Sequence, residues 1–400
     1  MRSSRWFIPA LAAFLYFSEG FPFGVVNETV NTYVSLMHVK LATIGLIGGV
    51  GIIWTIKFLW SPLVDLFGTY RVWIFGALIA MAIALAALGN TEPASGAFWA
   101  ALVLLTIASA THDIAADALL IRVTPDEQLG LVNSTRVAAY RAAMIVAGGG
   151  ITLLADQIGW RNAFMVGACV PLLIFAILFF TAPPERSTSV RRENPFSALL
   201  TWLTRPRALA LLAVVLLYRL GDNSMMAMIR PYWVSRGFTA TEIGNVTTTL
   251  GMICTILGAI AGGAFVSRFG IYRGLVILGL VQMLSNFAYA IVAMTNAGRP
   301  GLYGAAIVET FCGGLGTAAF LSFLMFICDR DNAATEYAML SALFAFGRTG
   351  AVMISGVLAQ RLGFASYYWL TAALALPGLA LLPLIRPRVS ASATDAAPAQ

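Results

Sequence analysis

The sequence of 400 residues is 59% hydrophobic and only 11% charged, against roughly 25% charged in a soluble domain. This composition excludes a soluble globular protein, because no soluble fold can bury so much apolar surface. The apolar runs are continuous rather than alternating, which also excludes a β-barrel.

A helix needs about 20 apolar residues to cross a bilayer, and the sequence holds twelve such segments. With the N-terminus inside, most Lys and Arg side chains, Arg136 among them, fall at cytoplasmic ends and loops. Both termini are therefore expected in the cytoplasm. The net charge of +7 then sets the orientation in a membrane, and no nucleic-acid partner is expected. The first apolar run continues past Phe23 without a cleavage site, which predicts a first span rather than a signal peptide.

One long polar run, residues 182–207, divides the chain into two halves. Within it, residues 195–202 alternate apolar and polar at helical spacing, which predicts a helix along the inner membrane surface. We expect a six-helix bundle over residues 1–181, a cytoplasmic linker, and a second six-helix bundle over residues 208–388. The polar tail, residues 389–400, is expected to be disordered.

The spans expected in the first half are residues 6–27, 42–67, 72–90, 96–121, 134–157 and 162–181. Near the middle of the first span, Gly20 and Pro22 loosen the backbone hydrogen bonding, which is tolerated where a helix lines a water-filled cavity. Glu19 lies beside this weak point. It either pairs with an arginine or binds a proton.

Charged residues inside the other spans of the first half point to a polar interior. Lys57 is too far from the end of its span for simple snorkelling, which predicts a partner inside the bundle. Asp113 and Asp117 are four residues apart on one helix face, where two carboxylates raise each other's proton affinity. For Asp117, pairing with a loop arginine is the preferred alternative. His112 points away from this face and is expected to be a hydrogen-bonded packing residue.

The spans expected in the second half are residues 208–229, 243–266, 274–295, 302–328, 335–360 and 364–385. Their ionisable residues are Arg219, Asp222, Glu309 and Arg348. Arg219 and Asp222 are three residues apart on one helix and can pair locally.

Charges are absent from every third span, the third, sixth, ninth and twelfth, which predicts that these four face lipid. The charges within spans are Glu19, Lys57, Asp113, Asp117, Arg141, Arg219, Asp222, Glu309 and Arg348. Unpaired, they would cost more than the stability of a protein, so they must face each other or water. If the four basic residues each pair with an acidic one, one carboxylate is left unpaired. It is the candidate proton carrier, and Asp113 or Glu19 is the residue expected to provide it.

The two halves repeat. Phe67-Gly68-Thr-Tyr-Arg71 matches Phe269-Gly270-Ile-Tyr-Arg273, and the segment ending at Gly159 matches the one ending at Gly363. Two six-helix repeats joined by a cytoplasmic linker describe the major facilitator fold. The four cysteines fall inside spans at no metal-ligand spacing, so neither a metal site nor a cofactor is expected.

Several stretches resemble the AmpG-type anhydromuropeptide permeases and the related acetyl-CoA transporters of the major facilitator superfamily. They are Lys57-Phe-Leu-Trp-Ser-Pro-Leu-Val-Asp65, Thr111-His-Asp113-Ile-Ala-Ala-Asp117, Tyr140-Arg141, Leu217-Tyr-Arg-Leu-Gly-Asp222, Glu309-Thr-Phe-Cys-Gly-Gly-Leu-Gly-Thr317, Leu340-Ser-Ala-Leu343 and Gly347-Arg348. The resemblance implies a monomeric, proton-driven importer of cell-wall fragments in the bacterial inner membrane, working by alternating access.

The resemblance also implies roles for individual residues. Substrate would be bound by Arg141, Arg219, Asp222, Arg348, Tyr140 and Lys57. The proton would be carried by Asp113, Glu19, Asp117 or Glu309. The cytoplasmic motif that controls gating would comprise Asp65, Gly68, Arg71, Gly270 and Arg273.

Departures from the family pattern leave the substrate open. Glu19 stands where a small or polar residue is expected, and Arg219 replaces a usual lysine. A siderophore or acyl-CoA permease is the alternative within the superfamily. A membrane-embedded enzyme is disfavoured because the chain has neither HExxH nor GxSxG, and a sensor of cell-wall fragments is not separated from a transporter by the sequence.

Overall fold

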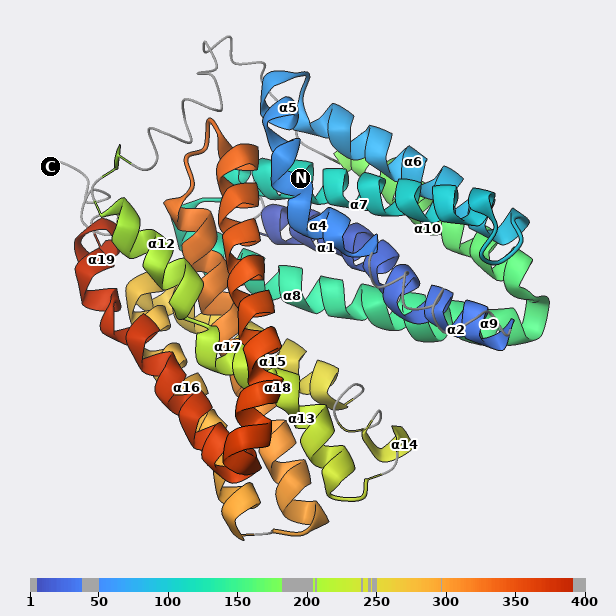
Figure 1. Cartoon of the computed structure of the whole chain (residues 1–400). Coiled ribbons are helices and arrows are strands. Elements are labelled where there is room, and N and C mark those ends of the chain that lie inside the picture. The colour runs from blue at the N-terminus through green and yellow to red at the C-terminus, as the bar shows by residue number, and fades with distance from the viewer. Residues whose placement is uncertain are drawn as a thin grey trace, which may run out of the picture. The chain divides into compact units, whose positions relative to one another are not determined.

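The computed structural model describes residues 6–37, 50–181, 204–205, 207–238, 240–243, 246, 250–295 and 297–390. Over this part of the chain all regular structure is helical and no strand occurs, as predicted (Figure 1). Ten of the described helices are long and apolar enough to cross a membrane. The predicted surface helix at residues 195–202, most of the linker, and residues 391–400 lie outside the described residues.

The chain divides into two compact units by its internal contacts. The first unit comprises residues 1–123, 135–199 and 328–339, and the second comprises residues 124–134, 200–327 and 340–400. The division therefore passes through two helices, α8 and α18, and not only through the linker.

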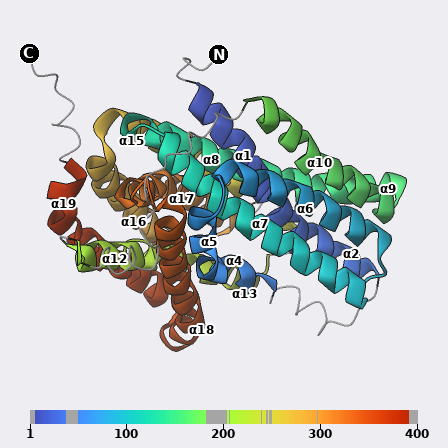
Figure 2. The same ribbon diagram turned by 90° about the horizontal axis from the view of Figure 1, so that it is seen from above.

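The first unit is built from the following helices, in chain order: α1 (Phe7–Gly24), the π-turn η1 (Val25–Thr29), α2 (Val30–Leu36), α4 (Ile52–Ile56), the 3₁₀ turn η2 (Lys57–Leu59), α5 (Ser61–Leu66), α6 (Tyr70–Asn90), α7 (Gly96–Val123), most of α8 (Leu129–Ile145), the π-turn η4 (Val146–Gly150), α9 (Ile151–Ile158) and α10 (Trp160–Thr181). In this unit α6 packs against both α7 and α10, and α1 packs against α7 (Figure 2).

The first span is longer than predicted, because it continues through η1 and α2 to Leu36 instead of ending near residue 27. Pro22 lies inside α1 and lacks a backbone N–H, and the π-helical turn η1 begins three residues after it. Gly20 is buried, and a Cβ at this position would lie 2.5 Å from the carbonyl oxygen of Tyr140. Gly20 therefore permits close packing on α8, a use that the sequence did not predict.

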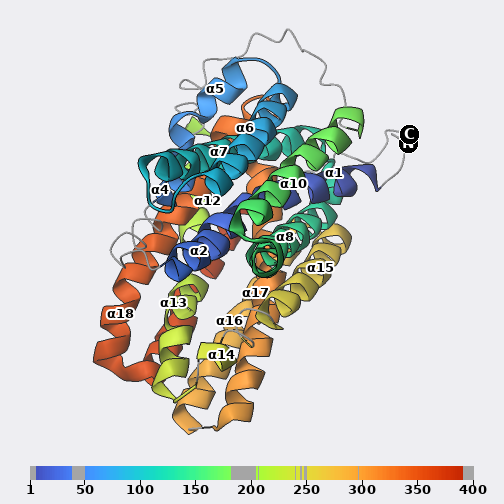
Figure 3. The same ribbon diagram turned by 90° about the vertical axis from the view of Figure 1, so that its right-hand side faces the viewer.

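The second unit contains α12 (Ala208–Leu217), α13 (Leu220–Ser235), α14 (Ala240–Ile243), α15 (Gly251–Phe269), α16 (Ile271–Thr295), α17 (Arg299–Ile327), most of α18 (Ala333–Ala380) and α19 (Leu382–Ser390). Here α17 packs against both α15 and α16 (Figure 3). Helix α19 reaches Ser390, into the segment expected to be disordered.

Glycines explain how closely α15 and α17 approach. A Cβ at Gly258 of α15 would collide with the carbonyl oxygen of Phe311, and one at Gly314 of α17 would collide with that of Thr255. Small residues of this kind let two membrane helices come into backbone contact, where van der Waals packing drives association.

The backbone has the same conformation at the glycines that match between the two halves. Gly68 and Gly270 have φ values of 71° and 85°, and Gly159 and Gly363 have values of 81° and 75°. All four therefore occupy the left-handed region that favours glycine. Each matched pair ends one helix and starts the next at the positions where the two halves align in sequence.

Candidate functional site

A break in the helix at Lys57 places its side chain inside the first unit. Pro62, in the first turn of α5, has no N–H to donate to the carbonyl oxygen of Phe58. The hydroxyl of Ser61 donates to that oxygen instead, at 3.0 Å. The chain thus changes from α4 through the 3₁₀ turn of Lys57–Leu59 into α5.

The Lys57 ammonium group forms an ion pair and a hydrogen bond with the carboxylate of Asp113 on α7. Both residues are 7% exposed. Two tryptophans hold the segment against α7, since the indole of Trp54 donates to Ser109 and that of Trp60 to Thr111, each at 3.2 Å. The predicted partner of Lys57 inside the bundle is confirmed.

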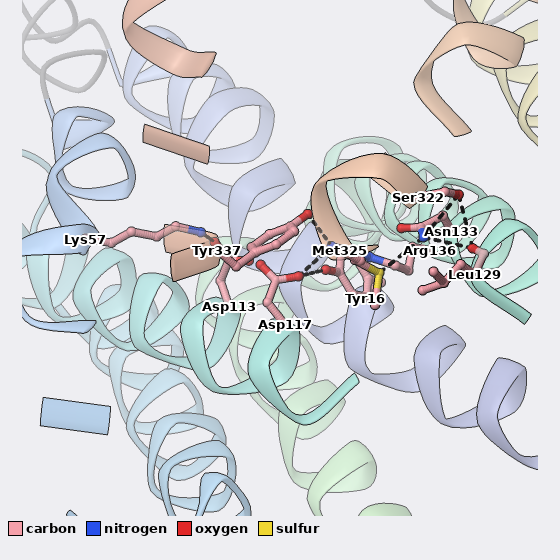
Figure 4. A network of polar contacts seen from close by, with 10 residues as sticks. All are labelled: Tyr16, Lys57, Asp113, Asp117, Leu129, Asn133, Arg136, Ser322, Met325 and Tyr337. Carbon is pink, nitrogen blue, oxygen red and sulfur yellow. Dashed lines mark hydrogen bonds and ion pairs between the residues drawn. The ribbon is translucent and has the colours of Figure 1, made fainter. Parts of the chain in front are cut away.

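Asp117, one helical turn after Asp113, binds Arg136 of α8 at 2.5 Å, and each side chain is 3% exposed. Tyr16 of α1 donates a hydrogen bond to the same carboxylate. The Arg136 guanidinium lies over the Tyr16 ring, 4.1 Å from its centroid, and donates to the hydroxyl of Tyr337 at 3.0 Å. Figure 4 shows these four side chains converging.

The position of Arg136 corrects two sequence predictions. The span was expected to begin at residue 134 with Arg136 at its cytoplasmic end, but α8 begins at Leu129, so Arg136 lies about two turns inside the helix. The partner of Asp117 is therefore a helical arginine rather than a loop arginine. Arg136 therefore joins the buried charges, as do Asp65 and Glu336, so the charges inside the helices are more numerous than the nine predicted.

Glu19 of α1 lies within electrostatic reach of Asp113, Asp117 and Lys57. Its Oε2 atom is buried without a hydrogen-bond partner among the described residues. His112 is fully buried, and its Nε2 atom lies 3.0 Å from the hydroxyl oxygen of Ser18. The prediction that His112 is a hydrogen-bonded packing residue is confirmed.

In the second unit, Arg219 and Asp222 form the predicted local ion pair. Arg219 lies at the break between α12 and α13, and it also donates to the hydroxyl of Thr317 on α17 at 2.5 Å. Both charged side chains are nearly buried, 11% and 9% exposed.

Glu309 of α17 is 2% exposed and lies within electrostatic reach of Asp222 and Arg219. It lines a cavity of about 270 Å³ in the second unit. The other lining residues are Met226, Ile229, Arg230, Tyr289, Ala306 and Thr310.

The remaining predicted substrate residues are more dispersed. Tyr140 and Arg141 are partly buried on α8, where the ring of Tyr140 packs against Phe23 and Arg141 approaches the sulfur of Met144 at 3.9 Å. Arg348 is exposed on α18 and makes no ion pair with the part of the chain that the structure describes.

The predicted gating motif includes Asp65. Its carboxylate accepts a hydrogen bond from the Tyr70 hydroxyl at 2.7 Å and three from the first turn of α18. The donors are the backbone N–H groups of Ala334, at 3.3 Å, and Thr335, at 2.8 Å, and the Thr335 hydroxyl, at 2.5 Å. Asp65 thus caps the start of a helix that is distant in sequence.

The two arginines of the predicted gating motif, Arg71 and Arg273, lie in different surroundings. The guanidinium of Arg71 donates to the carbonyl oxygen of Phe179 at 2.6 Å, near the end of α10, and stacks on the ring of Phe75. Arg273, its counterpart in the repeat, is exposed.

Comparison with known proteins identifies the family. The model of the Major Facilitator Superfamily matches residues 10–335. An anhydromuropeptide permease of Escherichia coli K12 is 34% identical over 94% of this chain and 79% of its own length. A putative AmpG 4 transporter of Rickettsia conorii is 27% identical over 93% of this chain and 95% of its own.

Two solved structures share the fold. The transporter FucP, in an outward conformation, has a TM-score of 0.73 at 15% identity and covers 94% of this chain and 98% of its own. The proton:xylose symporter XylE has a TM-score of 0.68 at 15% identity and covers 96% and 95%. With charged pairs buried inside a helical bundle and a relative matched along nearly the whole chain, this multi-pass inner-membrane protein belongs to the major facilitator superfamily of transporters, in the family of the AmpG-type anhydromuropeptide permeases.

Proposed function

We propose that the chain imports anhydromuropeptides together with protons across the inner membrane by alternating access. The observation that carries the proposal is the similarity to an anhydromuropeptide permease over nearly the full length of this chain. The buried charges support it, because ionisable residues inside membrane helices mark substrate and proton pathways.

The proposed topology has twelve spans, two six-helix bundles over residues 1–181 and 208–388, and both termini in the cytoplasm. Among the ten candidate spans, Ala333–Arg386 has 54 residues, about twice the length that one crossing needs. Its break at Gly363 supports two crossings. The short helices between Ile52 and Leu66 are proposed to form a further span.

Asp113 and Glu19 are the proposed proton carriers, with Asp117 and Glu309 as the other carboxylates to test. Neutralising Asp113 would remove the negative partner of Lys57. The lysine would then be free to bind an anionic group of the substrate. Proton binding and substrate binding would thereby be linked at a single ion pair.

Besides Lys57, the proposed substrate-binding residues are Tyr140 and Arg141 of the first unit and Arg219, Asp222 and Arg348 of the second. Arginines suit this task because a guanidinium can bind a peptide carboxylate in a bidentate manner. The exposed position of Arg348 and the partly buried position of Arg141 leave both side chains accessible to a ligand.

Asp65, Gly68, Arg71, Gly270 and Arg273 are proposed to control the cytoplasmic gate. The carboxylate of Asp65 lies at the positive end of the α18 dipole, so the bonds to the first turn of α18 would stabilise one state of the gate. Breaking them would be one step of the transport cycle.

The test is uptake of labelled anhydromuropeptide into right-side-out and inverted vesicles, with and without an uncoupler. We expect accumulation in right-side-out vesicles that collapses with the uncoupler. Uptake of a labelled siderophore or acyl-CoA, without muropeptide uptake, would refute the substrate and favour the alternative permeases. Binding without accumulation would refute transport and favour a sensor. The protein is proposed to act as a monomer, which cross-linking in the same vesicles can check.

A further inference from the structure

We propose that the cavity beside Glu309 binds a zwitterionic amino-acid end of the transported peptide, with Glu309 holding the ammonium group and Arg230 holding the carboxylate. This inference rests on the proposed function, since it names which part of the muropeptide this cavity recognises.

Glu309 supplies the carboxyl group that would face the ammonium group. The residue is only 2% exposed, and its Oε2 atom has no hydrogen-bond partner among the described residues. A buried polar atom without a hydrogen bond is costly. Because the residue lines the cavity, a cation entering it can supply the missing interaction.

The surroundings of Glu309 favour an ammonium group over a bulky cation. Tyr289, which is fully buried, forms an aromatic wall of the cavity, and ammonium groups are attracted to aromatic rings. The hydroxyl of Tyr289 accepts a hydrogen bond from the Trp233 indole at 3.3 Å, which holds the ring in place.

Arg230 supplies the positive group. It follows Met226 by one helical turn on α13, so both side chains lie on one face, and both line the cavity. Arg230 is exposed, whereas Glu309 is buried. No ion pair joins the two within the described part of the chain. The cavity therefore offers a carboxyl group and a guanidinium group that are not bound to each other. This arrangement suits a ligand that carries an ammonium group and a carboxylate on one small unit.

The cavity volume agrees with this ligand. About 270 Å³ is just under the typical range of small-molecule sites, roughly 300–1,000 Å³. It can accept one amino-acid end but not a whole sugar-peptide, so the sugars would be bound elsewhere.

The experiment measures equilibrium binding to the purified full-length protein in detergent, which needs no proton gradient. The probes are an anhydromuropeptide with a free amino-acid end and the same molecule after N-acetylation, which removes the ammonium charge and keeps the carboxylate. We expect the wild type to bind the free form ~10-fold more tightly, as for a charge-assisted hydrogen bond. Glu309→Gln should abolish this preference, because it weakens binding of the free form only.

Arg230→Gln should weaken binding of both probes by a similar factor, since both keep the carboxylate. Arg361→Gln removes an exposed arginine that does not line the cavity and should change neither affinity. Arg230 is exposed, so its substitution does not disturb the packed interior. This variant keeps the test decisive if Glu309→Gln fails to fold.

Three results would overturn the assignment: equal binding of both probes by the wild type, equal weakening of both by Glu309→Gln, or unchanged binding by Arg230→Gln. If the Glu309→Gln variant still binds the free form more tightly than the N-acetylated form, but loses gradient-driven uptake in vesicles, then Glu309 binds the proton and not the ammonium group. A wild type that binds neither probe would refute the muropeptide function itself, whereas equal binding of both refutes only the role of the cavity.

Discussion

Removing Arg136 should destabilise the first unit strongly, because its partner Asp117 is shielded from water. The Arg136 and Asp117 side chains are each 3% exposed and lie 2.5 Å apart. Removing one partner of such a buried pair leaves a buried charge without compensation and costs about 3–5 kcal/mol. We therefore expect Arg136→Met to lower the free energy of unfolding by this amount.

The double variant Arg136→Met, Asp117→Leu should recover most of the loss, because two apolar side chains of similar volume often replace a buried ion pair without penalty. The resulting interaction energy in the double-mutant cycle is expected to be about 3 kcal/mol. Arg136→Lys should not rescue fully, since an ammonium group cannot stack on Tyr16 as the planar guanidinium does.

The assay is reversible unfolding of the purified protein in mixed micelles, followed by tryptophan fluorescence. Asp331→Asn is the matched control, because Asp331 pairs with Arg122 at 3.9 Å and its side chain is 70% exposed. An exposed pair contributes about 0–1 kcal/mol. If Arg136→Met costs no more than this control, or if the two single losses simply add in the double variant, the pair is not shielded from water and the reasoning is wrong.

Three further predictions concern transport, the gate and packing. Asp113→Asn should abolish uptake driven by the proton gradient while the protein stays folded, and unchanged uptake in right-side-out vesicles would remove Asp113 from coupling. Asp65→Ala removes the cap of α18, so a cysteine introduced by Thr335→Cys should react more with a thiol reagent added on the cytoplasmic side. Equal labelling with and without Asp65→Ala would argue against a gate. Gly314→Ala should cost about 1–3 kcal/mol by overpacking, measured by unfolding, whereas Gly304→Ala meets open space and should cost less; equal losses would contradict the close contact of α15 and α17.

Several parts of the site could be predicted from local sequence. The pairing of Arg219 with Asp222 depends only on a spacing of three residues within a helix. The need of Lys57 for an interior partner follows from its distance to the membrane surface. His112 was predicted to be a packing residue from its place on the helix opposite Asp113 and Asp117.

Other parts depend on contacts between segments distant in sequence. The sequence predicts a span that begins at residue 134, with Arg136 at its cytoplasmic end, but α8 begins five residues earlier, at Leu129. Nothing near it in sequence shows that Tyr16, Asp117 and Tyr337 surround it. Tyr16 does carry one signal, because Leu15-Tyr16 in the first half repeats as Leu217-Tyr218 in the second, and both tyrosines are buried.

Apolar length, charge placement and repeated glycines are properties of local segments, so they predict a helical membrane protein with an internal repeat. The pairing of the charges, the interior position of Arg136 and the shared cavity of Glu309 and Arg230 are seen only in the folded chain. A buried charge is stabilised by whichever partner the packing brings within hydrogen-bond distance. Packing between helices is not encoded in the periodicity of any single one.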